Sequence, residues 1–291
     1  MAVEELKKTL VLGHRNPDTD SICSAICYAG FKHQLTGENY EPCRAGNVNP
    51  ETQYVLDYFK LKAPRLVENV KTQVKDIEIR KTKGVSRGIS LKNAWGLMQE
   101  NNVVTLPCVT EEGLLEGVIT IGDITKSYMN LYDSSIISKA CTKYANILDT
   151  LEGSMVVGDS EAYFDRGKVL IAAANPDLME NYIEKHDLVI LGNRYESQLC
   201  AIEMEAGCII VCEGAGVSLT IRKLAQERGC AVITTPYDTY TTARLINQSM
   251  PISYFMTKEN IIEFSEEDYL DDIREIMASK RHRDFPVLDS D

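Results

Sequence analysis

The first sixty residues alternate short apolar runs with polar loops and helical stretches. Residues 8–13 have the pattern of a buried strand, residues 21–34 that of a helix, and residues 41–45 that of an extended segment. Pro50 then opens a second helix, because proline is favoured at the first helical position. The pattern predicts two strand-loop-helix units of a parallel sheet.

A different pattern follows. Apolar residues at helical spacing predict a helix from Leu91 to Met98, with Trp95 on its buried stripe. Two apolar runs, at 103–109 and 114–120, are joined by a Glu-Glu-Gly turn and predict a hairpin. A last helix is expected to begin at Gly122 and Asp123, where Asp123 is placed to cap it. The order is β-α-β-β-α.

The helix of this unit and the strand after it recur further along the chain. A shift of 179 residues aligns Leu91, Ala94, Leu97, Met98 and Pro107 with Leu270, Ile273, Ile276, Met277 and Pro286. Two copies of one supersecondary unit therefore flank a different segment. We expect the second copy to be cut off at Asp291, just after its strand at 285–288.

The segment between the copies alternates strands and helices. Apolar runs at 155–157, 169–173, 188–191, 209–211 and 231–234 predict strands, and helices are expected to start near Pro176, Tyr195, Val217 and Thr239. Such alternation is typical of a small α/β domain with a largely parallel sheet.

Charge and cysteine content narrow the class of protein. The 43 acidic and 31 basic residues leave a net charge of -12, which disfavours nucleic acid and anionic membranes as partners. Nine cysteines without a Cys-x-x-Cys pair are typical of reduced thiols. No apolar run approaches the roughly 20 residues of a membrane-spanning helix. We expect a cytoplasmic protein.

The loop after the first strand carries candidate chemistry. His14, Asp18 and Asp20 present one imidazole and two carboxylates where ligands of α/β sheets gather. This donor set suits Mn, Mg or Zn, and Pro17 stiffens the loop so that the aspartates point together. The alternative is a plain turn in which Asp20 or Ser21 caps the next helix.

The same residues resemble the start of a known family. Gly13 to Ser21 match the G-H-x-N-P-D-T-D-S signature of the family II inorganic pyrophosphatases, which belong to the DHH phosphoesterase superfamily. The resemblance implies that His14, Asp18 and Asp20 bind catalytic Mn²⁺ or Co²⁺, and that Mg²⁺ accompanies the substrate pyrophosphate.

Other ligands of that family have no counterpart in this sequence. The paired histidines of the DHH motif, further aspartates and the C-terminal arginine and lysine that hold pyrophosphate are without a match, and the four histidines of the chain include no adjacent pair. The resemblance therefore implies that the catalytic site is incomplete in this chain and that the chain alone is inactive.

The repeated unit resembles a CBS domain, whose pairs commonly bind adenine nucleotides. The segments 105–109 and 117–123 match the strand and the G-x-x-T-x-x-D ending of that family. Thr120 offers a hydroxyl, Asp123 accepts from ribose hydroxyls, and Val103 and Ile119 are expected to sandwich the base. For Thr120 and Asp123 the alternative is a simple helix cap.

In the second copy, residues 251–257 resemble the strand that opens a CBS domain. The charges of residues 280–283 lie close to the expected phosphates, although they are equally typical of a solvated helix end. The residues expected to bind AMP or ADP are Asn101, Val103, Ile119, Thr120, Ile121, Gly122, Asp123, Ser253, Thr257, Arg281, His282 and Arg283.

The middle segment resembles the DRTGG domain, which lies between the two CBS domains in CBS-containing pyrophosphatases. A Gly-x-Gly follows the strand at 209–211, but the third glycine or Gly-Lys-Ser of a phosphate loop is missing. We interpret Gly214 and Gly216 as a tight structural turn.

The predicted architecture is α/β: the start of a DHH-type parallel-sheet domain (1–66), a first CBS domain (67–132), a DRTGG domain (133–249) and a truncated second CBS domain (250–291). The resemblance implies a manganese-dependent pyrophosphatase that AMP or ADP inhibits, diadenosine polyphosphates activate, and CBS contacts hold as a homodimer. The alternatives are a non-catalytic adenine-nucleotide-binding module and another DHH phosphoesterase.

Overall fold

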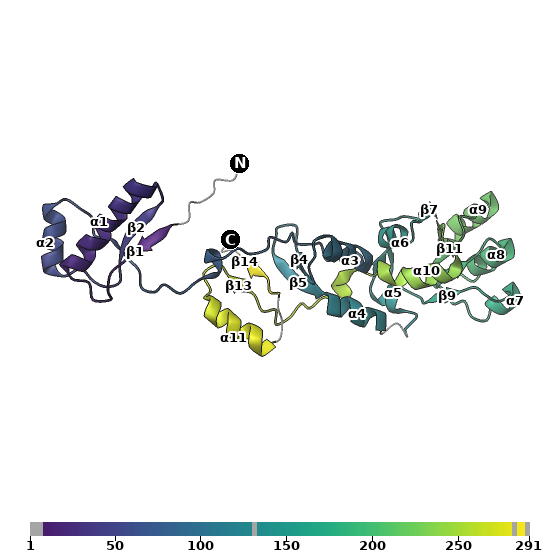
Figure 1. Cartoon of the computed structure of the whole chain (residues 1–291). Coiled ribbons are helices and arrows are strands. Elements are labelled where there is room, and N and C mark those ends of the chain that lie inside the picture. Colours follow the sequence, from purple (N-terminus) through teal and green to yellow (C-terminus); the bar gives the residue numbers. More distant parts are fainter. Residues whose placement is uncertain (1–7, 130–132, 281–283, 289–291) are drawn as a thin grey trace. The chain divides into compact units, whose positions relative to one another are not determined.

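The computed structural model describes residues 8–129, 133–280 and 284–288. The chain divides into two compact units (Figure 1), which are Met1–Glu78 with Glu266–Lys280, and Ile79–Ser265 with Arg281–Asp291. The backbone therefore passes from one unit to the other three times. Arg281, His282 and Arg283, which were predicted to bind nucleotide, lie outside the described residues.

The first unit opens with a three-stranded parallel sheet in the order β1-β2-β3, formed by Thr9–Val11, Tyr40–Arg44 and Arg65–Leu66. Helix α1 (Thr19–Thr36) joins the first two strands and α2 (Pro50–Tyr58) joins the last two. The two predicted strand-loop-helix units are confirmed. The same unit also contains the 3-10 turn η1 (Val74–Asp76) and helix α11 (Leu270–Lys280).

Local signals explain where these helices begin and end. Asp18 caps α1 by accepting a hydrogen bond from the Ser21 amide, and Asn49 caps α2 in the same way through the Thr52 amide. Helix α1 ends at Gly37, whose φ of 72° is a left-handed conformation that glycine adopts without a steric penalty.

The second unit begins with four of the five elements of the predicted β-α-β-β-α pattern, since its first strand is reduced to an isolated bridge between Val85 and Cys108. Helix α3 (Leu91–Glu100) is followed by an antiparallel hairpin of β4 (Thr105–Val109) and β5 (Leu115–Thr120), and then by α4 (Ile121–Met129). Strands alternate their side chains between two faces, so Leu106, Cys108 and Ile119 enter the core.

The helical pattern predicted Trp95 to be a core residue, and this prediction is wrong. Its side chain is 44% exposed, whereas Leu91, Ala94 and Met98 are buried. Each residue turns an α-helix by about 100°, so Trp95 lies a full step around the helix from Ala94. The buried stripe is narrower than predicted, and the tryptophan lies outside it.

A five-stranded sheet forms the centre of the second unit, in the order β7-β12-β11-β10-β9. Its strands are Ser154–Val157, Ala231–Thr234, Cys208–Val211, Leu188–Leu191 and Val169–Ile171, all parallel except the edge strand β7. Helices α7 (Pro176–Met179), α8 (Tyr195–Glu203), α9 (Leu219–Arg228) and α10 (Thr239–Leu245) alternate with them, which confirms the predicted α/β domain.

Both faces of this sheet are covered. Ile190 and Ile210 belong to a core cluster shared with the β4-β5 hairpin, whereas Val189 and Ile209 belong to a second cluster on the opposite face. Strands buried on both sides need continuous apolar runs, which is why the sequence identifies them. Four small elements were not predicted, namely α5 (Ile136–Lys139), β6 (Thr142–Lys143), α6 (Tyr144–Thr150) and β8 (Tyr163–Phe164).

The predicted strand at 251–257 is wrong. The 3-10 turn η3 (Ile252–Tyr254) lies in this segment, and a second turn, η2 (Ile246–Ser249), precedes it. Only isolated bridges remain, from Pro251 to Ser90 and from Thr257 to Val118. The second copy continues in β13 (Phe264–Ser265), which pairs with β14 (Val287–Leu288) in parallel.

Candidate functional site: a cavity beside the hairpin and an N-terminal polar loop

A cavity of about 620 Å³ lies in the second unit. It is lined by one face of the β4-β5 hairpin, by the extended segment 79–84 and by residues 284–288. The hairpin residues that line it, such as Thr105 and Val118, are those that alternate with the buried core positions. The strand period therefore separates a core face from a cavity face.

Segment 79–84 is held close to β4. The Val85 amide donates to the Pro107 carbonyl at 2.9 Å, and the Val109 amide donates to the Val85 carbonyl at 2.9 Å. A methyl group on Gly84 would meet Cγ2 of Val109 at 2.4 Å, so this approach requires glycine.

Thr120 and Asp123 are locked to each other at the end of β5. The Thr120 hydroxyl and amide both donate to Oδ2 of Asp123, at 2.7 and 3.0 Å, and the Asp123 amide donates back to the Thr120 hydroxyl at 3.2 Å. Both residues are half-buried. Thr120 pairs with Thr105 across the hairpin and so shares its strand face, but neither Thr120 nor Asp123 is among the residues that line the cavity. The pair caps α4 and orients a carboxylate.

The other residues predicted to contact the nucleotide lie in different environments. Val103 lines the cavity, but Ile119 is fully buried in the core, so its side chain offers no surface to a base. The Asn101 side chain donates to the Leu97 carbonyl at 2.8 Å at the end of α3. Ser253 lies in η3 and donates its amide to the Arg87 carbonyl. Thr257 pairs its backbone with Val118.

Sequence reasoning missed two cations that line the cavity. Arg80 and Lys81 belong to segment 79–84, and Arg80 donates through Nη1 to the Asn102 carbonyl at 2.8 Å. The signal was present as the basic run from Arg80 to Lys83 ahead of Gly84. Its meaning depends on the pairing of this segment with β4, which the sequence pattern alone does not give.

The N-terminal loop brings two of the three predicted metal ligands together. Nε2 of His14 lies 3.5 Å from Oδ1 of Asp18, and both side chains are more than half exposed. The Ser21 amide, which donates to Asp18 at 2.8 Å, and the nearby His14 lower the pKa of Asp18. Asp20 accepts from the Ser24 hydroxyl at 3.1 Å instead. The helix is thus capped by Asp18 rather than by Asp20 or Ser21.

The loop is closely packed at two of its glycines. A methyl group on Gly13 would meet the Ser21 hydroxyl at 2.0 Å, and one on Gly46 would meet the Arg15 carbonyl at 2.3 Å. Even so, the described residues contain no group of three His, Cys, Asp or Glu side chains that could hold a metal ion. His14 and Asp18 suit a hard divalent cation chemically, but they do not make a complete site by themselves.

The Gly214 turn is structural, as predicted. Glu213 and Gly214 have φ angles of 63° and 62°, and their amides donate to the carbonyls of Tyr237 and Thr235 at 2.8 Å. Amides that are already paired cannot cradle a phosphate. No helix among the described residues is both long and apolar enough to span a membrane.

Comparison with known proteins assigns these parts. The CBS domain family matches residues 74–130 and the DRTGG domain family matches residues 146–249. A crystal structure of the CBS and DRTGG domains from the regulatory region of Clostridium perfringens pyrophosphatase, complexed with the activator diadenosine tetraphosphate, is 35% identical. It covers 76% of this chain and 96% of that one, with a TM-score of 0.71. The chain belongs to the CBS- and DRTGG-containing family of inorganic pyrophosphatases.

Two curated pyrophosphatases extend the similarity over nearly the whole chain. The cobalt-dependent inorganic pyrophosphatase of Clostridium perfringens is 39% identical over 279 residues, which are 96% of this chain and 51% of the relative. A probable manganese-dependent inorganic pyrophosphatase of Thermotoga maritima is 29% identical over 282 residues, or 97% and 51%. The chain spans about half the length of these relatives. The predicted family and the α/β fold class are confirmed, while the exact domain boundaries and site residues stay predictions.

Proposed function

We propose that this chain functions as part of a manganese- or cobalt-dependent inorganic pyrophosphatase. Such an enzyme hydrolyses pyrophosphate to two phosphates, and we propose that adenine nucleotides regulate it. The observation that carries the proposal is the similarity to metal-dependent pyrophosphatases along 96% of the chain, together with a cavity in the CBS part. A non-catalytic adenine-nucleotide-binding module is the second candidate, because the described residues lack a complete metal site.

The cavity suits an adenine nucleotide by its chemistry. Val103 and Val109 supply apolar surface for a base, and Arg80 and Lys81 supply cations for phosphate. The Thr120 hydroxyl and amide fix Oδ2 of Asp123, so the carboxylate is held in one orientation in which it can accept from ribose hydroxyls. We therefore propose AMP or ADP as the ligand of this cavity.

The N-terminal loop is proposed to contribute to the metal site through His14, Asp18 and Asp20. The Ser21 amide and His14 lower the pKa of Asp18 and so keep its carboxylate ionised. A bound Mn²⁺ or Co²⁺, with Mg²⁺ on the substrate, would supply charge neutralisation for pyrophosphate and an activated water. Further ligands have to come from outside the described residues.

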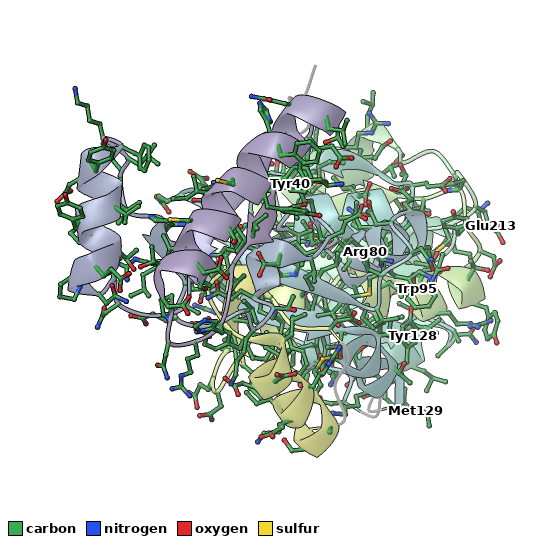
Figure 2. All side chains as sticks on the ribbon, turned by 60° about the vertical axis from the view of Figure 1, so that its left-hand side comes forward. Tyr40, Arg80, Trp95, Tyr128, Met129 and Glu213 are labelled. Carbon is green, nitrogen blue, oxygen red and sulfur yellow. The ribbon has the colours of Figure 1, made fainter. Side chains whose placement is uncertain are left out.

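We also propose that the protein is a homodimer through its CBS part. Trp95 on α3 and Tyr128 and Met129 on α4 are large side chains exposed by 44%, 43% and 71% (Figure 2). The two helices pack against each other, so these side chains belong to neighbouring elements.

We also propose a cytoplasmic location, which the nine free thiols of the chain support.

Calorimetric titration with AMP tests the nucleotide site. We expect Asp123→Ala and Lys81→Met each to weaken binding by about tenfold, since one loses a charge-assisted acceptor and the other a phosphate partner. Glu111→Ala, in the exposed hairpin turn, is the matched control and should bind like the unchanged protein. Undiminished affinity in both site variants would remove this cavity from the proposal.

Pyrophosphate hydrolysis in the presence of Mn²⁺ separates the two candidate functions. Turnover that is lost in the Asp18→Ala, Asp20→Ala double variant would establish catalysis at the N-terminal loop. AMP binding with neither turnover nor Mn²⁺ binding at the loop would instead favour the non-catalytic module. Titration of Mn²⁺ into the same variants reports metal binding independently of activity.

A further inference from the structure

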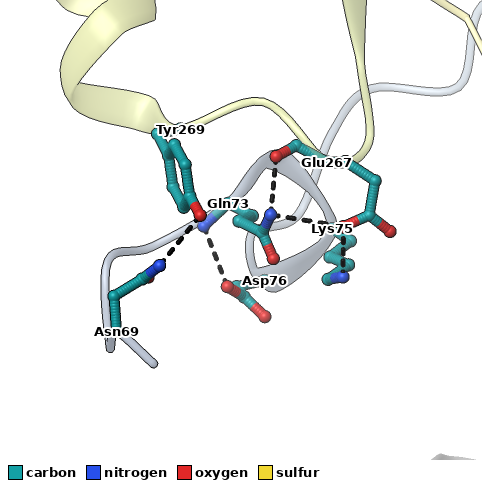
Figure 3. A network of polar contacts seen from close by, with 6 residues as sticks. All are labelled: Asn69, Gln73, Lys75, Asp76, Glu267 and Tyr269. Carbon is teal, nitrogen blue, oxygen red and sulfur yellow. Dashed lines mark hydrogen bonds and ion pairs between the residues drawn. The ribbon is translucent and has the colours of Figure 1, made fainter. Parts of the chain in front are cut away.

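Two distant segments of the first unit are tied together side by side (Figure 3). Residues 69–76 follow the β1-β2-β3 sheet, and residues 266–270 lead into α11. The amides of Val74 and Lys75 donate to the carbonyls of Asp268 and Glu266, and the Leu270 amide donates to the Thr72 carbonyl, each at 3.0 Å. We call this pair of segments the strap.

Side chains reinforce the backbone bonds of the strap. The Gln73 side-chain amide donates to the backbone carbonyl of Glu267 at 2.6 Å and to its carboxylate at 3.2 Å. Lys75 Nζ lies 2.6 Å from the same carboxylate. The Asn69 side chain donates to the Tyr269 hydroxyl at 2.9 Å, and the Lys71 ammonium lies 5.5 Å from that ring.

Residues 69–76 of the strap also form contacts among themselves. The Gln73 amide donates to Asp76 Oδ2 at 2.9 Å, which closes the short turn η1, and the Val74 side chain is only 3% exposed. Segments of this length have no stable conformation of their own in water. Their order therefore depends on the pairing, so a shift of one segment is felt by the other.

The strap lies next to two of the three places where the backbone changes unit. Glu78 is followed by the cavity-lining residues Ile79 and Arg80, and Glu266 is preceded by Phe264–Ser265, which form β13. Strand β13 pairs with β14, whose residues also line the cavity. Both segments of the strap are thus covalently continuous with elements at the cavity.

We propose that the strap is the coupling element through which nucleotide binding at the cavity reaches the N-terminal loop, with Gln73 and Glu267 as its positioning residues. This inference rests on the proposed nucleotide site. A ligand shifts the equilibrium between two conformations of a protein only if it binds them with unequal affinity. We infer that the position of the strap differs between two such conformations, and that both the cavity and the N-terminal loop respond to it. Couplings between sites are commonly 5- to 150-fold in affinity.

Hydrogen exchange with and without saturating AMP tests this role on the full chain. In the unchanged protein, AMP should alter exchange at the cavity, at residues 69–76 and in the sheet residues 9–58. In the Gln73→Ala, Glu267→Ala double variant, AMP should still bind within about threefold of its normal affinity, but the change at residues 9–58 should disappear. The single Gln73→Ala variant should show a partial loss.

Glu275→Ala is the control, because it removes an exposed carboxylate from α11 without touching the strap. A response at residues 9–58 that persists in the double variant, or that is missing from the unchanged protein while AMP binds, overturns the strap and leaves the nucleotide site intact. Absence of any binding heat with AMP overturns the nucleotide site, and the strap proposal with it.

Discussion

The Cys108 and Cys230 thiols are sealed inside the second unit, with 0% and 1% of their surface exposed. Burial raises the pKa of Cys108 to about 11 and that of Cys230 to about 12, because a thiolate would lose its hydration. Only the thiolate is a nucleophile or a metal ligand. These cysteines therefore act as small apolar side chains.

The raised pKa values make stability depend on alkaline pH. In the unfolded chain these thiols ionise near their ordinary value of 9.0, whereas in the fold they stay neutral. The contribution is fully present below pH 9 and is lost as pH rises toward 11–12. Denaturant unfolding between pH 8 and 10.5 should show this decline. Cys108→Ala with Cys230→Ala should make the decline smaller, with the buried Cys208 still contributing to it, and the exposed Cys27→Ala should leave it unchanged.

The contact between Thr120 and Asp123 could be expected from the sequence because it is local. The two residues are three positions apart and bond to each other at the end of one strand, whereas their role in nucleotide binding stays a prediction. Arg80 and Lys81 line the cavity because Val85, directly after segment 79–84, pairs with β4 and brings the segment there. Ile119 was misassigned because a strand period shows two faces without showing which one is the core.

At the scale of elements, α3 depends on one buried cap. Ser90 is fully buried, its hydroxyl accepts from the Asn93 amide at 3.1 Å, and the next amide, that of Leu91, donates to the Met250 carbonyl. The Ser90 hydroxyl therefore caps the helix, while the Leu91 backbone amide separately holds the start of α3 to the end of η2.

Ser90→Ala should therefore destabilise the second unit by about 1 kcal/mol, the usual cost of a lost N-cap. Urea unfolding followed by circular dichroism measures the change. Ser154→Ala, on the exposed edge strand β7, is a comparable serine deletion and should fall within about 0.5 kcal/mol of the unchanged protein. Equal effects of the two substitutions would contradict the capping role.

Elements were predictable in proportion to how fully they are buried. Strands β10 and β12 were placed at their observed bounds because each is a run of apolar residues between polar loops. Helix α2 was placed from its Pro50 signal, yet Tyr54 and Tyr58 are more than 70% exposed. Residues 251–257 have an apolar pattern that a strand and a 3-10 turn share, so the sequence could not separate the two.

For the whole molecule, two compact units predict two unfolding transitions. Leu56→Ala should lower one of them and Ile210→Ala the other, since each removes a fully buried side chain at a cost of about 2–5 kcal/mol. AMP at 100 times its dissociation constant should stabilise the transition of the Ile210 unit by about 2.7 kcal/mol. Scanning calorimetry resolves the two. A single transition that all three changes move together would contradict this division.

The threefold passage of the backbone between the units has a practical consequence for anyone who shortens the gene. A fragment starting at Ile79 would keep α11 but discard Thr72, Val74 and Lys75, whose backbone groups pair with residues 266–270. The backbone groups of residues 266–270 would then lose these hydrogen-bond partners to water. A self-sufficient nucleotide-binding fragment should therefore begin ahead of Asn69, so that it carries both segments of the strap.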